Sequence, residues 1–185
     1  MTTLTLRGWL ALELALLVRD GVRGNGSTRL DQGTRRLIVL AWIVAFVAAE
    51  LVAGWLGPAP RGNSGGGHLI AGLVVMWAGL AVRIWAILVL GRAFRTTVEV
   101  DPGQGVVDRG PYRWVRHPSY TGTLVISTGV GLTLGNCLSL AIMLLLPLAA
   151  MLRRISVEET ALTEVLGQPY QAYQARTKRL VPGLW

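Results

Sequence analysis

The run of residues 117–152 contains no Asp, Glu, Lys or Arg, and this constrains the fold more than any other feature of the sequence. A single helix over roughly its last thirty residues would measure about 45 Å, whereas the hydrocarbon core of a bilayer is about 30 Å thick. The segment "LGNC" (residues 134–137) interrupts the run, and Gly and Asn tolerate turns. We therefore expect a helical hairpin of two short arms that folds back at this segment, with Pro147 kinking the second arm.

Two further stretches are long and apolar enough to cross a bilayer. Residues 37–56 contain one charged side chain, Glu50, and residues 69–90 contain one, Arg83. Only 15% of all residues are charged, whereas a soluble domain has about 25%. The composition therefore favours a membrane protein, as the apolar runs do.

The N-terminal segment gives a weaker signal. The first eighteen residues are apolar, but Arg7 and Glu13 interrupt them, so we expect an interfacial helix, with a fifth span as the alternative. No small-residue cleavage site follows, which argues against a signal peptide. The sequence thus predicts an all-α integral membrane protein with about four to five transmembrane helices, including the C-terminal hairpin.

Basic residues gather in three segments: before the first long span, after the second, and after the hairpin. The connection between the first two spans carries only Arg61, and the hairpin tip carries no charge. The positive-inside rule then predicts that the three basic segments, and with them the C-terminus, face the cytoplasm. Contact with anionic headgroups explains the net charge of +8, and no nucleic-acid-binding signature accompanies it.

Two polar pieces flank the hairpin on this same predicted side. Residues 96–100 alternate in a β-prone pattern and residues 101–105 are rich in turn formers, which fits a short hairpin or a lid. Residues 156–179 are typical of a helix that breaks at "GQP" and resumes with Tyr170 and Tyr173 on one face. A pocket made from both pieces could be reached from the cytoplasm and from between the helices.

Candidate functional residues occur in both polar pieces. Arg154 and Glu158 are four positions apart and share a helix face where the last span leaves the membrane. Alone, such a pair is usually a surface ion pair worth at most about 1 kcal/mol. In "RHPSY", the His beside Arg and the Tyr would, on composition alone, be headgroup and interfacial contacts.

The order of the motifs changes this interpretation. "LGRAF" is followed by "GPYRWVRHPSYTG", an apolar hairpin, "RISVEETAL", "GQPYQAY" and a closing "LVPGLW". This arrangement resembles the isoprenylcysteine carboxyl methyltransferase family over residues 90–185, and it is also similar to phospholipid N-methyltransferases. The resemblance implies a membrane enzyme that takes a methyl group from S-adenosylmethionine without a Rossmann sheet. Residues 1–36 would then hold the N-terminal helix and a basic loop, residues 37–90 two transmembrane helices, and residues 91–185 the catalytic part.

The resemblance also assigns roles to individual residues. Arg154 would bind the substrate, and Arg154 and Glu158 would be the catalytic pair. Glu99 aligns insecurely with a further cofactor contact. No metal site is implied. The cofactor-binding residues would be Gln104, Gly105, Val106, Val107, Tyr112, His117, Pro118, Ser119, Tyr120 and Glu158.

Acceptor chemistry favours O-methylation. A carboxylate is already anionic at neutral pH, so its methylation needs no general base, and Arg154 could orient it through two parallel hydrogen bonds. We expect a lipophilic acceptor, an isoprenylcysteine-like or other lipid acid, that enters from the bilayer. A lipid amine N-methyltransferase, an NADPH-dependent membrane reductase and a non-catalytic scaffold remain alternatives. Arg83 could reach the active site or extend to the headgroups, and Glu50 could simply be interfacial.

Overall fold

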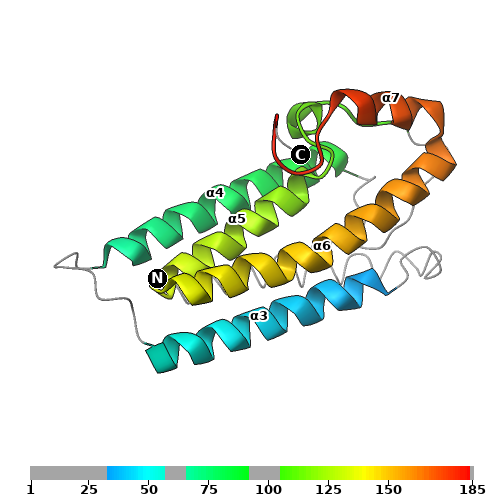
Figure 1. Cartoon of the computed structure of the whole chain (residues 1–185). Helices are drawn as coiled ribbons and strands as arrows, with labels where there is room; N and C mark the ends of the chain where they lie inside the picture. Colours follow the sequence, from blue (N-terminus) through cyan, green and yellow to red (C-terminus); the bar gives the residue numbers. More distant parts are fainter. Residues whose placement is uncertain (1–32, 57–65, 92–104, 184–185) are drawn as a thin grey trace.

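The structure is a computed structural model that describes residues 33–56, 66–91 and 105–183 of the chain. Its described part is built from helices, and its only β-type pairing is an isolated parallel bridge between Val115 and Lys178. The predicted β-prone segment at residues 96–100, most of the following turn and the first eighteen residues lie outside the described residues. The elements in chain order are α3 (Thr34–Leu56), α4 (Gly67–Leu90), the 3₁₀ turn η2 (Gly110–Arg113), α5 (Pro118–Thr133), α6 (Cys137–Leu166) and α7 (Gln168–Arg176) (Figure 1).

Three of these helices, α3, α4 and α6, are long and apolar enough to cross a membrane. Large apolar side chains on α3 and α4 point outward, including Trp55, which is 87% exposed, and Leu88, which is 73% exposed. Such a surface is stable against lipid tails rather than water. The two spans predicted from the sequence correspond to α3 and α4, and the chain is an integral membrane protein of the all-α class.

The predicted hairpin is present, and its turn lies where the sequence indicated. α5 ends at Thr133 and α6 begins at Cys137. Gly135 adopts a left-handed conformation with φ of 75°, and the Asn136 side chain caps α6 by accepting the N–H of Ser139 at 2.8 Å. Gly135 therefore provides the left-handed conformation of the turn and Asn136 the N-cap of α6, which are the roles that these two residue types favour.

The second arm is not short, which corrects the prediction. α6 has 30 residues and continues through the buried Pro147 and past the end of the apolar run to Leu166. Nothing in its polar second half breaks a helix, and it ends only at Gly167, whose φ is 59°. One continuous helix therefore carries both the last span and the polar segment that follows it.

α4 and α5 pack with their backbones in contact. A Cβ atom added to Gly79 would lie 2.7 Å from the carbonyl oxygen of Gly122, and one added to Gly129 would lie 2.7 Å from the carbonyl oxygen of Gly72. Small residues at such positions let membrane helices approach closely. The four glycines thus fix α5 against α4.

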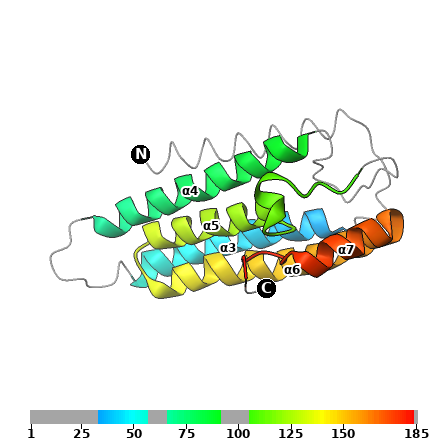
Figure 2. The same ribbon diagram turned by 90° about the horizontal axis from the view of Figure 1, so that it is seen from above.

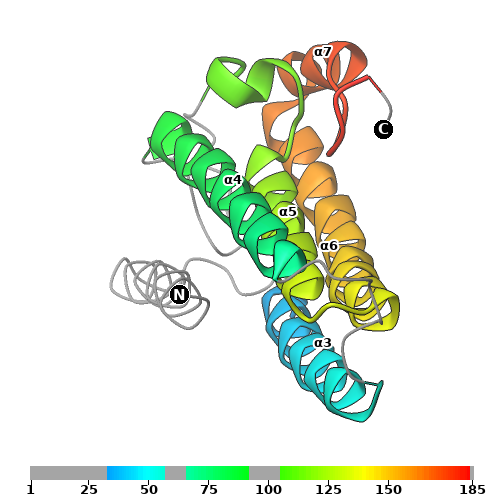
Figure 3. The same cartoon turned by 90° about the vertical axis from the view of Figure 1, so that its left-hand side faces the viewer.

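The other helix pair, α3 and α6, meets along the bundle and is tied by a hydrogen bond from the Ser139 hydroxyl to the Ala49 carbonyl at 2.8 Å (Figure 2). At the far end of the bundle, η2 and α7 lie together over the ends of α4, α5 and α6 (Figure 3). All polar candidate residues that the structure describes belong to this end. The buried core between the helix pairs consists of Ala45, Ala49, Met76, Ile126, Val130 and Met143.

Candidate active site

The hydroxyl of Tyr120 joins the arginine and the glutamate that the sequence singled out. Arg154 Nε donates a hydrogen bond to this hydroxyl at 2.6 Å, and the hydroxyl donates to Glu158 Oε2 at 2.7 Å. Tyr120 lies in the first turn of α5, while Arg154 and Glu158 lie one helical turn apart on α6. Arg154 is only 3% exposed, so it is not part of an ordinary surface ion pair.

A second contact holds Arg154 from the side of α3. Its Nη1 donates to the hydroxyl of Thr34 at 3.3 Å, and Thr34, the first residue of α3, is 2% exposed. Three helices therefore meet at one guanidinium. Thr34 could not be identified from the sequence, because a threonine at the start of a span belongs to no recognisable pattern.

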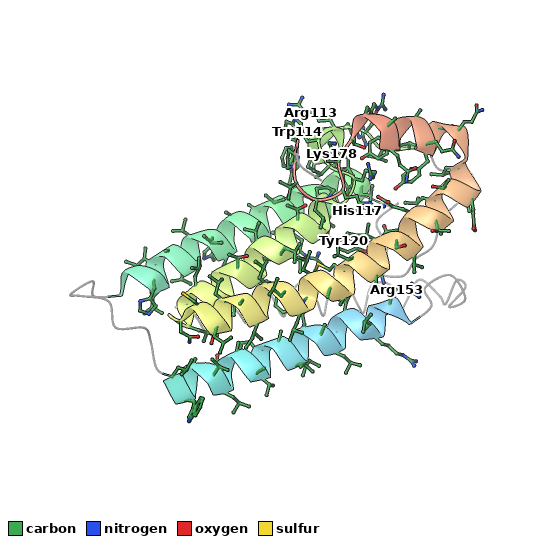
Figure 4. All side chains as sticks on the ribbon, viewed as in Figure 1. Arg113, Trp114, His117, Tyr120, Arg153 and Lys178 are labelled. Atoms are coloured by element: carbon green, nitrogen blue, oxygen red, sulfur yellow. The ribbon has the colours of Figure 1, made fainter. Side chains whose placement is uncertain are left out.

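His117 lies beside the same tyrosine. Its ring stacks on the Tyr120 ring with centroids 5.5 Å apart and an interplanar angle of 19°. The imidazole is 5% exposed, and its Nε2 lies 3.2 Å from Glu159 Oε1. His117 and Tyr120 lie near each other at this end of the bundle (Figure 4). Through the Tyr120 hydroxyl they converge with Arg154 and Glu158 in one cluster, as the sequence predicted.

Glu159 is a second residue beside the cluster for which the sequence predicted no role. Its carboxylate accepts hydrogen bonds from Arg116 Nε at 2.7 Å and from Arg179 Nε at 3.0 Å, in addition to its contact with His117. It is 5% exposed, so these partners compensate a buried charge. The sequence does contain a signal for this contact, namely the adjacent pairs Arg116–His117 and Glu158–Glu159. Adjacency alone does not show which of the two glutamates faces the "RHPSY" segment.

The segment after α7, residues 177–180, is bound along the "RHPSY" segment, and we call it the C-terminal strap. The backbone N–H of Arg116 donates to the Lys178 carbonyl at 2.7 Å, and that of His117 donates to the Arg179 carbonyl at 3.0 Å. The Thr121 hydroxyl donates to the Leu180 carbonyl at 2.7 Å. Residues far apart in sequence therefore hold His117 in place.

Tyr112, another predicted cofactor residue, is buried between α4 and α7. Its hydroxyl donates to the Ala86 carbonyl at 3.4 Å, and its own carbonyl accepts from the Tyr173 hydroxyl at 2.7 Å. Burial raises the pKa of Tyr112, and the nearby Glu158 carboxylate raises it further. Tyr170 and Tyr173 lie one turn apart on α7 with ring centroids 5.9 Å apart, and burial raises the pKa of both phenols.

Ser119 and Pro118 begin α5 and face its packing partners. Arg83 Nη1 donates to the Ser119 hydroxyl at 2.8 Å, to the Ser119 carbonyl at 3.2 Å and to the Thr123 hydroxyl at 2.7 Å. Arg83 is 7% exposed, so it reaches toward the start of α5 rather than to the headgroups. Pro118 is fully buried at the first helical position, where its missing N–H costs nothing. Glu50 is exposed on α3.

The remaining predicted cofactor residues precede η2. Gly105, Val106 and Val107 form irregular chain, which is joined to α7 by the exposed ion pair of Asp108 with Arg176. Gln104 and Glu99 lie outside the described residues. Within the described ranges, no group of three or more His, Cys, Asp or Glu side chains could hold a metal ion.

The family model of the isoprenylcysteine carboxyl methyltransferases matches residues 70–164, which is more than half of the chain and includes Tyr120, Arg154 and both glutamates. The chain belongs to this family. The match begins near the start of α4 and ends near the end of α6, so it contains the hairpin and most of the cluster.

Individual relatives agree with the family. Protein-S-isoprenylcysteine O-methyltransferase A of Arabidopsis thaliana is 32% identical over 113 residues, which cover 60% of this chain and 57% of the relative. The enzyme named protein-S-isoprenylcysteine O-methyltransferase in Tribolium castaneum is 34% identical over 113 residues, which cover 60% of this chain and 40% of the relative. The chain thus spans about half the length of these curated relatives.

A solved structure of the family has the same fold. The eukaryotic intramembrane Ras methyltransferase ICMT matches with a TM-score of 0.65 and 28% sequence identity, over 78% of this chain and 52% of the solved chain. This likeness extends over a larger share of the chain than the sequence matches do.

Proposed function

We propose that this chain is an S-adenosylmethionine-dependent methyltransferase of the membrane that methylates the carboxylate of an isoprenylcysteine-like or other lipid acid. The observation that carries the proposal is the pair of hydrogen bonds that joins Arg154 and Glu158 to the Tyr120 hydroxyl. This brings a cation suited to an acidic acceptor next to a carboxylate suited to an amino group. The names of the relatives, protein-S-isoprenylcysteine O-methyltransferases, support the same class of acceptor.

The chemistry of the cluster fits the proposed methyl donor. S-adenosylmethionine supplies an electrophilic methyl carbon on a sulfonium sulfur, and it also carries an amino group, a carboxylate, a ribose and a purine. We assign Glu158 to the amino group, and His117 and Tyr112 to the carboxylate and the ribose. The Tyr120 and Ser119 side chains and Pro118, which fixes the start of α5, belong to the same wall. The backbone of Gln104, Gly105, Val106 and Val107 would complete it.

Arg154 is assigned to the acceptor. Its bonds to Tyr120 and Thr34 set the plane of the guanidinium, and a carboxylate would approach in that plane. The transfer forms a bond from a carboxylate oxygen to the methyl carbon and breaks the methyl–sulfur bond, so no proton has to be removed. Correct alignment of these atoms can lower the barrier by about 7–11 kcal/mol.

The position of the cluster in the bundle suggests a separate route of entry for each substrate. The cluster lies where α5 begins and where α6 leaves its apolar stretch, so a lipophilic acceptor can enter laterally from the bilayer. The water-soluble methyl donor would enter from the polar end formed by η2 and α7. We place this end in the cytoplasm because described basic residues gather there, at the start of α3, ahead of α5 and past the apolar part of α6 (Arg35, Arg36, Arg109, Arg113, Arg116, Arg153 and Arg154).

The test uses purified full-length protein in lipid nanodiscs with radiolabelled S-adenosylmethionine. The acceptors are a prenylated cysteine analogue and panels of lipophilic acids, thiols and amines. We expect methyl transfer to the acids. Arg154→Ala should abolish turnover but largely spare binding of S-adenosylmethionine, whereas Glu158→Ala should weaken that binding, as measured by calorimetry.

Arg153→Ala is the matched control, because this arginine is adjacent to Arg154 but exposed. It should retain turnover. Unchanged turnover in Arg154→Ala would show that this residue does not orient the acceptor carboxylate. Transfer to amines in place of acids would favour an N-methyltransferase, and saturable binding of NADPH in place of S-adenosylmethionine would favour a reductase.

A further inference from the structure

Exposed basic and aromatic side chains form a patch at the polar end of the bundle, which we call the headgroup patch. It consists of Trp85 on α4, Arg113 and Trp114 at the end of η2, and Lys178 in the C-terminal strap. Trp85 and Trp114 are each 44% exposed, and Arg113 and Lys178 are also exposed. Figure 4 shows Arg113, Trp114 and Lys178 close together at this end, with Arg153 at a separate place on α6.

The patch is built by the way η2 lies on α4. Gly110 has a φ of 59°, and a Cβ atom there would lie 2.9 Å from a methyl group of Val89. This close approach places the ring of Trp114 edge-on to that of Trp85, with centroids 6.0 Å apart and an interplanar angle of 69°. The guanidinium carbon of Arg113 lies 4.0 Å from the centroid of the Trp114 ring, which is a favourable cation–π distance.

Lys178 is brought to the patch by the backbone of the strap. Its N–H donates to the Trp114 carbonyl at 3.3 Å, and the residue forms the isolated bridge with Val115. Among the described residues, the ion pairs near the patch use Arg116, Arg176 and Arg179, and neither Arg113 nor Lys178 takes part in them. The patch therefore presents positive charge to its surroundings.

We propose that the headgroup patch binds the phosphate-bearing headgroup of an anionic phospholipid. Arg113 and Lys178 supply charged donors for the phosphate oxygens, with Arg113 offering a planar fork and Lys178 a compact charge. Trp85 lies near the end of α4, which is long and apolar enough to span a membrane, and its neighbours Ile84 and Leu88 are 39% and 73% exposed.

The two tryptophans favour a lipid over a soluble phosphate as the ligand. Tryptophan is favoured at the membrane–water interface, where its ring meets the boundary between headgroups and acyl chains. The patch adjoins the exposed apolar surface of α4, because Trp85 lies on this helix and contacts Trp114. A headgroup bound there would have its acyl chains along α4 and its phosphate at Arg113 and Lys178.

The experiment measures lipid retention by the full chain. Protein purified in detergent is incubated with an equimolar mixture of phosphatidylglycerol and phosphatidylcholine, and the retained lipids are counted by native mass spectrometry. We expect the wild type to retain phosphatidylglycerol preferentially. Each of Arg113→Gln and Lys178→Gln should weaken this preference about fivefold, the effect of one basic side chain near an anionic surface.

Arg153→Gln is the matched control, since it removes an exposed arginine at the same end of the bundle but outside the patch. It should leave the preference unchanged, and Arg113→Lys, which keeps the charge, should retain most of it. Trp114→Phe should likewise bind more phosphatidylglycerol than Trp114→Leu, because the phenyl ring keeps an aromatic face. Thermal unfolding without added lipid checks that each variant is folded.

Three results would overturn the proposal. Equal retention of the two lipids by the wild type would mean that no headgroup is selected. An equal loss in Arg153→Gln and Arg113→Gln would mean that diffuse surface charge attracts the lipid. Displacement of phosphatidylglycerol by glycerol phosphate at the same concentration would mean that the site binds soluble phosphate. Because the readout is lipid retention, none of these results depends on methyltransferase activity.

Discussion

The phenol of Tyr120 connects two oppositely charged side chains of α6, those of Arg154 and Glu158. It accepts from Arg154 and donates to Glu158, so its hydroxyl uses both hydrogen-bonding functions at once. Removing it would leave the guanidinium and the carboxylate without the group that fixes their relative positions. The cluster is thus sensitive to the loss of a single oxygen atom.

Tyr120→Phe should therefore lower the rate of methyl transfer about tenfold or more, since hydrogen bonds to charged groups contribute about 1.5–3 kcal/mol. The measurement is kcat with the acid acceptor together with the Kd of S-adenosylmethionine. Tyr173→Phe is the control, because its hydroxyl binds the backbone carbonyl of Tyr112 instead of a charged side chain. Unchanged kcat and Kd in the Tyr120→Phe protein would show that the Tyr120 hydroxyl has no role in the site.

Glu159 has a structural role that stability measurements can isolate. Glu159→Gln replaces the carboxylate shared by Arg116, His117 and Arg179 with a neutral amide. Disrupting a buried charge cluster in this way costs about 3–5 kcal/mol, so the melting temperature in detergent should fall clearly. Glu164→Gln, an exposed position on the same helix, should leave it nearly unchanged. Equal melting temperatures for the two variants would contradict the role of Glu159.

The sequence identified one glutamate of this pair and not the other, and the reason is geometric. Glu158 lies four residues after Arg154 and so shares its helix face, which helical periodicity predicts. Glu159 faces the motif containing His117 and the C-terminal strap, and these partners are set by tertiary packing. Thr34 belongs to the same category, because its partner lies on a helix that no local pattern links to it. For Arg83 the sequence left two alternatives open, and only its contact with α5 decides between them.

At the scale of the elements, the glycines between α4 and α5 decide how the helices pair. Gly122→Leu should destabilise the bundle, since a Cβ atom there would lie 2.8 Å from the Gly79 carbonyl oxygen and 2.8 Å from the backbone nitrogen of Arg83. Overpacking of this kind costs about 1–3 kcal/mol or more. Thermal unfolding in detergent measures the loss. Gly54→Leu is the control, because no atom lies within 4 Å of a Cβ at that position on α3, and an equal loss there would contradict the argument.

The two long spans and the hairpin turn could be predicted from the sequence, whereas the length of α6 and the pairing of the helices could not. The apolar run and the turn residues Gly135 and Asn136 located the hairpin, because they act locally. The continuous course of α6 could not be predicted, since a change from apolar to polar residues like the one at its middle is also typical of the end of a span. The equal spacing of Gly72 and Gly79 with Gly122 and Gly129 was the available signal for the α4–α5 contact.

At the scale of the whole molecule, the side of the membrane that holds the cluster can be tested with Cys137. This is the sole cysteine of the chain, it is exposed, and it lies at the hairpin tip, at the other end of α6 from Glu158. A membrane-impermeant maleimide added to the non-cytoplasmic side should label it. A Cys137→Ser protein carrying Lys178→Cys should be labelled only after permeabilisation. The reverse pattern would place the cluster on the opposite side.

The contact of the C-terminal strap with residues 114–117 has a consequence for biosynthesis. Chains are made from the N-terminus, and their N-terminal parts fold first. Arg116 and His117 can acquire their backbone partners only after residues 178 and 179 have left the ribosome. The bundle can thus insert into the bilayer while the segment around His117 still lacks these partners, so a nascent chain would hold its membrane position before this cluster is complete.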